Sequence, residues 1–103
     1  HPGHDLAARQ QSGFGSLLSF ELTGGIDAVR RFTDGLQIID LAESLGGTES
    51  LLAHPATMTH AGMSPEARAA AGITDSLLRL SLGIEPVDDL LNEIRSALDR
   101  AVA

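Results

Sequence analysis

The chain contains no cysteine, which removes several kinds of site at once. It can form no disulfide, thiolate nucleophile or cysteine-ligated zinc site, and nothing in it indicates an oxidising compartment, so we expect a cytoplasmic protein. Long apolar runs are also missing, and residues 1–11 have no basic lead followed by an apolar stretch. The sequence therefore predicts neither a membrane span nor a signal peptide.

Lysine, tyrosine and tryptophan are absent as well, and all seven basic residues are arginines. A lysine amine is required for a Schiff base with an aldehyde cofactor, so these residues cannot form one. The only aromatic rings are Phe14, Phe20 and Phe32, each in a segment predicted to belong to the core. A self-contained cofactor site usually needs a richer set of aromatic and polar groups, so any such site requires residues from elsewhere.

Positive charge is scarce, because fourteen acidic side chains outnumber the seven arginines and give a net charge of −7. A surface of this sign argues against binding to nucleic acid, whose phosphates require a cationic partner. A length of 103 residues with 43% hydrophobic content fits one compact domain over residues 1–103.

The hydrophobic pattern alternates between strand and helix periodicity along the chain. Period-two alternation predicts strands within 14–23, 37–44 and 76–85, and helical spacing predicts helices within 2–11, 26–35, 64–72 and 86–102. A less regular extended piece covers 50–60, where Pro55 favours a sheet edge or a loop. This order predicts a two-layer α/β sandwich, in which helices cover one face of a small, mostly antiparallel or mixed sheet.

The last two predicted helices carry the clearest local signals. Ser64 is a predicted N-cap followed by Pro65 at the first helical position, and Gly72 ends that helix. The final helix begins at Pro86, and one apolar stripe is predicted to face the core: Val87, Leu90, Leu91, Ile94, Leu98 and Val102.

The first candidate site is the turn that follows the strand predicted at 37–44. Glu43 and Ser44 precede the pair Gly46 and Gly47, and such a turn can bring backbone N–H groups close to an anionic or planar ligand. Spacing alone is equally compatible with an ordinary structural turn. Glu43 is a candidate general acid or base, or simply an exposed carboxylate at the end of a strand.

The second candidate is Arg79, which lies on a predicted strand between leucines. Alternation places it on the polar face, where a guanidinium can make a two-pronged contact with a substrate carboxylate. A structural ion pair accounts for the residue equally well, and the sequence leaves both interpretations open.

The histidines do not form a metal-binding pattern. His54 and His60 are separated by five residues, which matches neither a helix-face nor a strand-face spacing, and His1 and His4 lie at the start of the chain. We expect hydrogen-bonded structural histidines and no metal site.

Three blocks carry a resemblance to a known family. LAESLGG-x-ESL, HPA-x-MTHA and RLS-x-GIE occur in the family's order and spacing, and the similarity extends over nearly the whole chain. With the segments around them they resemble the C-terminal domain of the Cys/Met-metabolism pyridoxal phosphate (PLP) enzymes, the transsulfuration family of fold type I. The resemblance implies that residues 1–103 are the substrate-side domain of a larger, homotetrameric enzyme, with PLP as cofactor and the missing large domain as partner.

The resemblance also implies roles for the candidate residues. Arg79 is implied to bind the α-carboxylate of an amino-acid substrate, and Glu43 to help discriminate between substrates. Ser44 is implied to be a catalytic residue that lies near the PLP–lysine imine and orients the lysine and the substrate. A glutamate at this position leans the interpretation toward cystathionine formation or cleavage. The implied reaction is a γ-replacement, in which cysteine displaces the acyl group of an activated homoserine such as O-succinylhomoserine.

The family's Schiff-base lysine, its pyridinium-binding aspartate and its phosphate-binding residues belong to parts that are not among these residues. We therefore expect the chain to be a fragment that binds no cofactor covalently and is inactive alone. A cystathionine γ-lyase or β-lyase, or a homoserine sulfhydrylase, remains an alternative within the family. From another class, an acidic interaction or oligomerisation domain remains an alternative that only the missing lysine supports.

Overall fold

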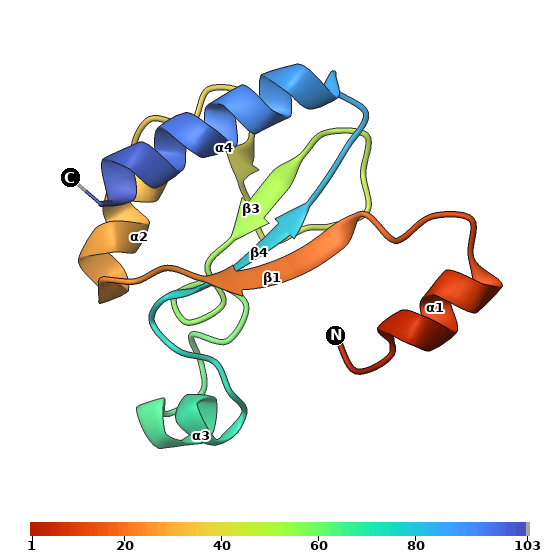
Figure 1. Cartoon of the computed structure of the whole chain (residues 1–103). Helices are drawn as coiled ribbons and strands as arrows, with labels where there is room; N and C mark the ends of the chain where they lie inside the picture. The colour runs from red at the N-terminus through yellow and green to blue at the C-terminus, as the bar shows by residue number, and fades with distance from the viewer. Residues whose placement is uncertain (103) are drawn as a thin grey trace.

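The computed structural model describes residues 1–102, which form an open four-stranded sheet and four helices (Figure 1). The helices are α1 (His4–Gln10), α2 (Gly25–Thr33), α3 (Pro65–Ala70) and α4 (Val87–Ala101). The strands are β1 (Leu17–Glu21), β2 (Asp40–Leu41), β3 (Leu51–Ala53) and β4 (Leu77–Ser81). Helices α2 and α4 pack together over one face of the sheet, while α1 and α3 stand away from it, as Figure 1 shows. The predicted α/β class is confirmed. Within residues 1–102, no helix is both long and apolar enough to span a membrane.

The strand order is β1-β4-β3-β2, so β4 and β3 occupy the middle of the sheet. Strand β4 is antiparallel to both β1 and β3, whereas β2 runs parallel to β3. The expectation of an edge or loop at 50–60 is therefore wrong for Leu51–Ala53, which is an interior strand. Pro55 does not disturb it, because the strand has ended by then and Pro55 begins a series of turns.

The strand predicted at 37–44 is much shorter in the structure, where only Asp40–Leu41 pairs with a neighbour. The residues before it bend around the carboxylate of Glu93 from α4, which accepts hydrogen bonds from the backbone N–H groups of Gln37, Ile38 and Ile39. Because this side chain satisfies those donors, the backbone needs no strand partner there.

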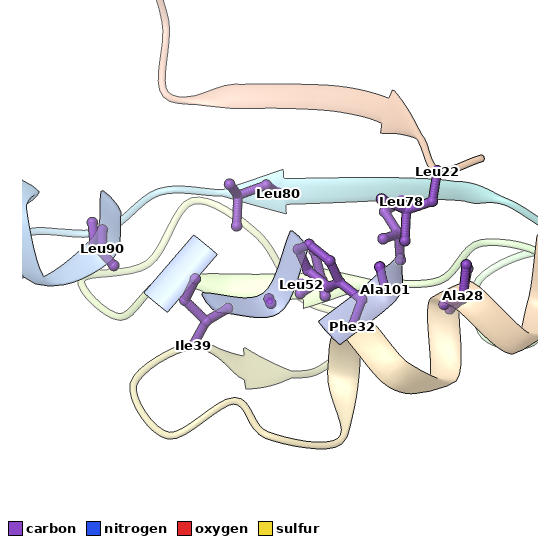
Figure 2. Close-up of a cluster of buried hydrophobic side chains, with 11 residues drawn as sticks. Leu22, Ala28, Phe32, Ile39, Leu52, Leu78, Leu80, Leu90 and Ala101 are labelled. Atoms are coloured by element: carbon purple, nitrogen blue, oxygen red, sulfur yellow. The ribbon is translucent and has the colours of Figure 1, made fainter. Parts of the chain in front are cut away.

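The core lies between the sheet and the two packed helices. Phe32 from α2, Leu52 from β3 and Leu78 from β4 are among its most deeply buried side chains (Figure 2). The ring of Phe20 tilts against that of Phe32 at a centroid distance of 5.9 Å, as expected of two rings predicted to share the core. The prediction that Phe14 is also a core residue is wrong: its side chain is 63% exposed and stacks on the ring of His4.

Helix α4 is rotated relative to the expectation from its apolar stripe. Its buried residues are Leu90, Ala97 and Ala101, while Leu91 and Leu98 of the predicted stripe are exposed. Val87 and Val102 are exposed too, and only Ile94 among the others is partly buried against the core. Alanines on the inner face let α4 approach α2 closely, which a row of leucines would prevent. The displaced stripe helps to line an apolar groove of about 370 Å³ between α4 and the β1–β4 edge, formed by Leu18, Phe20, Leu80, Leu82, Val87, Leu90, Leu91, Ile94 and Leu98.

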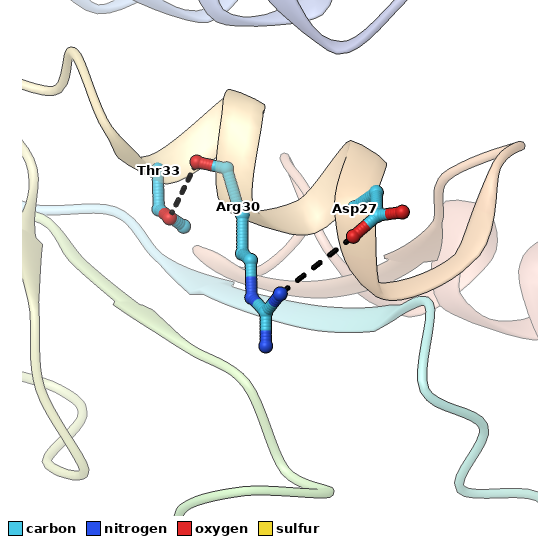
Figure 3. Close-up of polar contacts among 3 residues, drawn as sticks. All are labelled: Asp27, Arg30 and Thr33. Carbon is cyan, nitrogen blue, oxygen red and sulfur yellow. Dashed lines mark hydrogen bonds and ion pairs between the residues drawn. The ribbon is translucent and has the colours of Figure 1, made fainter.

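Two arginines fasten the ends of α2 and α4 to each other. Arg31 donates two hydrogen bonds to the carbonyl of Ala101, and Arg100 donates to the carbonyls of Arg31 and Phe32. These bonds satisfy carbonyl groups that a helix end leaves without an intrahelical partner. By contrast, the ion pair between Arg30 and Asp27 on the outer face of α2 joins two side chains that are more than 70% exposed, so it adds little stability (Figure 3).

The predicted start and end of α3 are confirmed. The Ser64 hydroxyl accepts a hydrogen bond from the Ala67 N–H at 3.1 Å, Pro65 occupies the first helical position, and Gly72 adopts a positive φ of 78° just after the helix.

Candidate substrate-binding site

The candidate site is built around Arg79 in the central strand β4. Leu78 and Leu80 point into the core on either side of it, so alternation turns Arg79 to the sheet face opposite α2 and α4. Its Nη2 donates hydrogen bonds to the carbonyl oxygens of Glu43 and Ser44, at 3.2 and 3.3 Å. The structure therefore brings together the three residues that the sequence singled out.

The contacts to Glu43 and Ser44 are made by main-chain carbonyls, while both side chains are exposed. The carboxylate of Glu43 and the hydroxyl of Ser44 are consequently open to solvent. Their proposed roles in discrimination and in orienting the cofactor stay predictions.

The contacts of Arg79 within residues 1–102 include no structural ion pair, and its role stays a prediction. No carboxylate lies within ion-pair distance of its guanidinium in the described residues 1–102, where the ion pair of Arg30 with Asp27 is on a different element. Its Nε is buried and lacks a hydrogen-bond partner within the same residues. A buried donor without an acceptor is uncommon in native structures, which makes Arg79 an unusual residue of this face.

A second residue of β4 contacts the same loop, and the sequence pattern did not single it out. The Ser81 hydroxyl accepts a hydrogen bond from the Gly46 N–H at 2.8 Å. Ser81 follows Arg79 by two residues, so both side chains lie on the same face of the strand. The two-residue spacing from Arg79 was the one signal in the sequence that could have identified Ser81. A serine on a strand is too common for that spacing to single it out.

The far end of the loop is closed by a clasp made of Ser50, Gly83 and Glu85. The Ser50 N–H and hydroxyl both donate to the Glu85 carboxylate, at 2.8 and 2.7 Å, and the Gly83 N–H donates to the Ser50 hydroxyl oxygen at 2.8 Å. The backbone and side-chain hydrogen bonds from Ser50 lower the pKa of Glu85 below its ordinary value. A Cβ at Gly83 would overlap the Thr48 carbonyl, so only glycine fits there. The clasp gives a structural reason for the serine, glycine and glutamate of the ESL and GIE blocks.

His54 and His60 both make hydrogen bonds within the chain. His54 is buried, and its two ring nitrogens lie 2.7 Å from the Thr57 hydroxyl and from the Asp75 carbonyl. His60 contacts the hydroxyl of Thr59. In the described residues, no three His, Asp or Glu side chains are grouped so that they could hold a metal ion.

Comparison with known proteins decides the family. The model of the Cys/Met metabolism PLP-dependent enzymes matches residues 1–99. The chain belongs to this family. The match covers the loop 43–46, strand β4 and the clasp residues, in agreement with the resemblance carried by the three sequence blocks.

Individual relatives of this family extend over nearly the whole chain. Cystathionine gamma-synthase of Escherichia coli K12 is 60% identical over 96% of the chain, and a Lactococcus lactis cystathionine beta-lyase is 51% identical over 97%. The crystal structure of cystathionine gamma synthase from Xanthomonas oryzae, in complex with cystathionine, is 68% identical and superposes with a TM-score of 0.89 over 99% of the chain. The chain spans about a quarter of the length of each of these proteins.

Pyridoxal phosphate is the cofactor of this family, and the residues present do not fit its attachment. The aldehyde of PLP requires a lysine amine, and the sequence has none. What these residues do present is an arginine, Arg79, whose guanidinium has no acidic partner in residues 1–102.

Proposed function

We propose that this chain is the C-terminal, substrate-side domain, over residues 1–103, of a PLP-dependent cystathionine γ-synthase. The reaction proposed for the whole protein is a γ-replacement on O-succinylhomoserine. The bond between Cγ and the succinyl oxygen breaks, the cysteine sulfur forms a bond to Cγ, and the products are cystathionine and succinate. PLP, bound by other residues of the protein, supplies the electron sink for this chemistry.

The observation that carries the proposal is the state of Arg79. Its Nη2 is held by the carbonyls of Glu43 and Ser44, which fixes the orientation of the guanidinium plane. Its charge has no carboxylate partner within residues 1–102. We propose that the α-carboxylate of the substrate supplies that partner, since a planar guanidinium matches a carboxylate in both charge and geometry.

The neighbouring side chains are assigned in the same proposal. The exposed Ser44 hydroxyl orients the lysine and the substrate, and the exposed Glu43 carboxylate takes part in discrimination between substrates. Both assignments rest on their position beside Arg79 and on the family's AESLGG block.

The choice of a synthase is supported by the degree of identity. The Escherichia coli cystathionine gamma-synthase is 60% identical to the chain, against 51% for the Lactococcus lactis cystathionine beta-lyase and 49% for the O-succinylhomoserine sulfhydrylase of Pseudomonas aeruginosa. The solved relative with 68% identity was crystallised with cystathionine.

We also propose the partners that complete the enzyme. The relatives are about four times as long as the chain, and the groove beside α4 is lined entirely by apolar side chains. A further part of the same polypeptide that covers this groove would remove the side chains from water. The assembled protein is proposed to be a cytoplasmic homotetramer.

Assays of the full-length enzyme test the reaction directly. Purified protein is given O-succinylhomoserine with cysteine, O-succinylhomoserine with sulfide, or cystathionine alone, and products are identified by mass spectrometry. The proposal predicts cystathionine and succinate as the fastest-formed products. Faster cleavage of cystathionine would identify a lyase, and faster formation of homocysteine from sulfide would identify a sulfhydrylase.

A further inference from the structure

The face of β4 that carries Arg79 makes hydrogen bonds to the loop 43–46 at two points, as a donor at one and as an acceptor at the other. Arg79 donates to the carbonyl oxygens of Glu43 and Ser44 at the start of the loop. Ser81, two residues further along the same face, accepts the N–H of Gly46 at its end. One strand therefore fixes both the carbonyl groups and the amide group of this short segment.

Arg79 and Ser81 differ in burial. The guanidinium of Arg79 belongs to a half-exposed side chain, whereas Ser81 is only 2% exposed and cannot itself reach a substrate in bulk solvent. The Gly46 N–H is brought to Ser81 by a left-handed backbone conformation with φ of 75°. An added Cβ at Gly46 would meet nothing within 4 Å, so space does not require a glycine here. The left-handed backbone conformation favours it instead.

We infer that Ser81 is a positioning residue for the substrate carboxylate: it fixes the loop whose carbonyl oxygens orient the Arg79 guanidinium. The inference rests on the proposed role of Arg79. Without the Ser81 hydroxyl, the Gly46 N–H loses its acceptor within the protein, and the loop can shift together with the carbonyls of Glu43 and Ser44. A planar two-pronged contact depends on orientation, so a small rotation of the guanidinium weakens carboxylate binding even though its charge remains.

The test uses the full-length enzyme with its cofactor and four variants: S81A, R79A, the double variant R79A/S81A, and S64A as matched control. Ser64 is also a serine whose hydroxyl accepts a backbone N–H, but it caps α3 and does not contact the loop 43–46. Steady-state kinetics with O-succinylhomoserine and cysteine give kcat and KM for each variant. Hydrogen–deuterium exchange of peptides covering residues 43–49 reports on the loop independently of activity.

The inference predicts that S81A lowers kcat/KM by about fivefold or more, chiefly through KM, while S64A changes it by less than about twofold. S81A should add little further loss in the R79A background, because a residue that acts through Arg79 has no effect once Arg79 is gone. Exchange in residues 43–49 should be faster in S81A than in the wild type and in S64A. If S81A does not fold, S81C serves instead, since a thiol is a weaker acceptor than a hydroxyl, and a raised KM is again expected.

Two results would overturn the inference and leave the proposed function intact: an unchanged KM in S81A beside a large loss in R79A, or losses that multiply fully in the double variant. An unchanged kcat/KM in R79A is a different result, which removes Arg79 from the site and overturns the inference with it.

Discussion

At the scale of single residues, the position of a candidate residue was predictable where a charged side chain occupies an unusual place in the sequence. Arg79 stood out because a charged residue between strand leucines needs a reason, and the sequence placed it on the correct face. Its contacts could not be predicted, because they are made by main-chain carbonyls of a loop that is far away in sequence. The contact of Ser81 could not be predicted for the same reason. Its hydroxyl accepts a hydrogen bond from a backbone N–H of the loop, and no sequence motif marks such a serine.

Gly83 offers a prediction at this scale. A methyl group there would collide with the Thr48 carbonyl, which accepts the hydrogen bond from the Ile84 N–H in the same turn. We expect Gly83→Ala to destabilise the protein by about 1 to 3 kcal/mol, as overpacking commonly does. Thermal melting measures the effect, with Gly62→Ala as control because a Cβ there meets nothing within 4 Å. Equal melting temperatures for the two variants would show that the turn can relax freely.

At the scale of elements, the residue pattern predicted which segments are helices and strands better than it predicted which surfaces they bury. The order of elements and the capped start of α3 could be read from alternation, proline and serine. The face of α4 that is buried could not be read in this way. Leucines predict an apolar contact, but they do not specify whether they lie in the core or line a groove. The shortening of β2 depends on Glu93, a carboxylate more than fifty residues away.

The clasp between the start of β3 and the segment after β4 gives a prediction about pH. The pKa of Glu85 is lowered in the folded protein by its hydrogen bonds from Ser50, so its contribution to stability is full above the ordinary value of 4.5. It is lost progressively as the pH falls below that value through the lowered pKa of the folded state. We expect Glu85→Gln to be less stable than wild type at neutral pH and the difference to shrink in acid.

Melting temperatures across a pH series measure this difference, and Glu21→Gln, which removes the same charge from an exposed position of β1, is the control. A gap between Glu85→Gln and wild type that stays constant down to the acid limit would show that the ionised carboxylate does not maintain the clasp.

At the scale of the whole molecule, the groove beside α4 predicts how the isolated chain behaves in solution. Its lining is apolar, and four of its residues are exposed: Leu18, Val87, Leu91 and Leu98. We expect the 103-residue chain to self-associate through this surface, since burial of such a patch is favourable. Light scattering over a dilution series should show association that Leu91→Glu and Leu98→Glu weaken. The control is Leu6→Glu, which changes an exposed leucine of α1 outside the groove. A strict monomer at high concentration contradicts the prediction.

The composition of the whole chain gives another prediction. Because no lysine is present, the isolated chain mixed with PLP should develop no internal-imine absorbance and no borohydride-reducible adduct at a side chain. Absorbance spectroscopy followed by mass spectrometry of the reduced protein measures this. A stoichiometric side-chain adduct would mean that these residues hold the cofactor in some other way.

The central claim is that Arg79 binds the substrate carboxylate, and parallel measurements of kcat/KM and melting temperature on Arg79 variants of the full-length enzyme test it most directly. Charge-assisted hydrogen bonds contribute about 1.5 to 3 kcal/mol each, so Arg79→Lys should lower kcat/KM by about tenfold or more and Arg79→Ala by considerably more. Cofactor absorbance should change little, and the melting temperature should fall only modestly, because Arg79 has no ion-pair partner within residues 1–102 and loses only its two hydrogen bonds to the loop carbonyls. A lower melting temperature with kcat/KM near that of the wild type would contradict the claim and make Arg79 a brace of the loop 43–46.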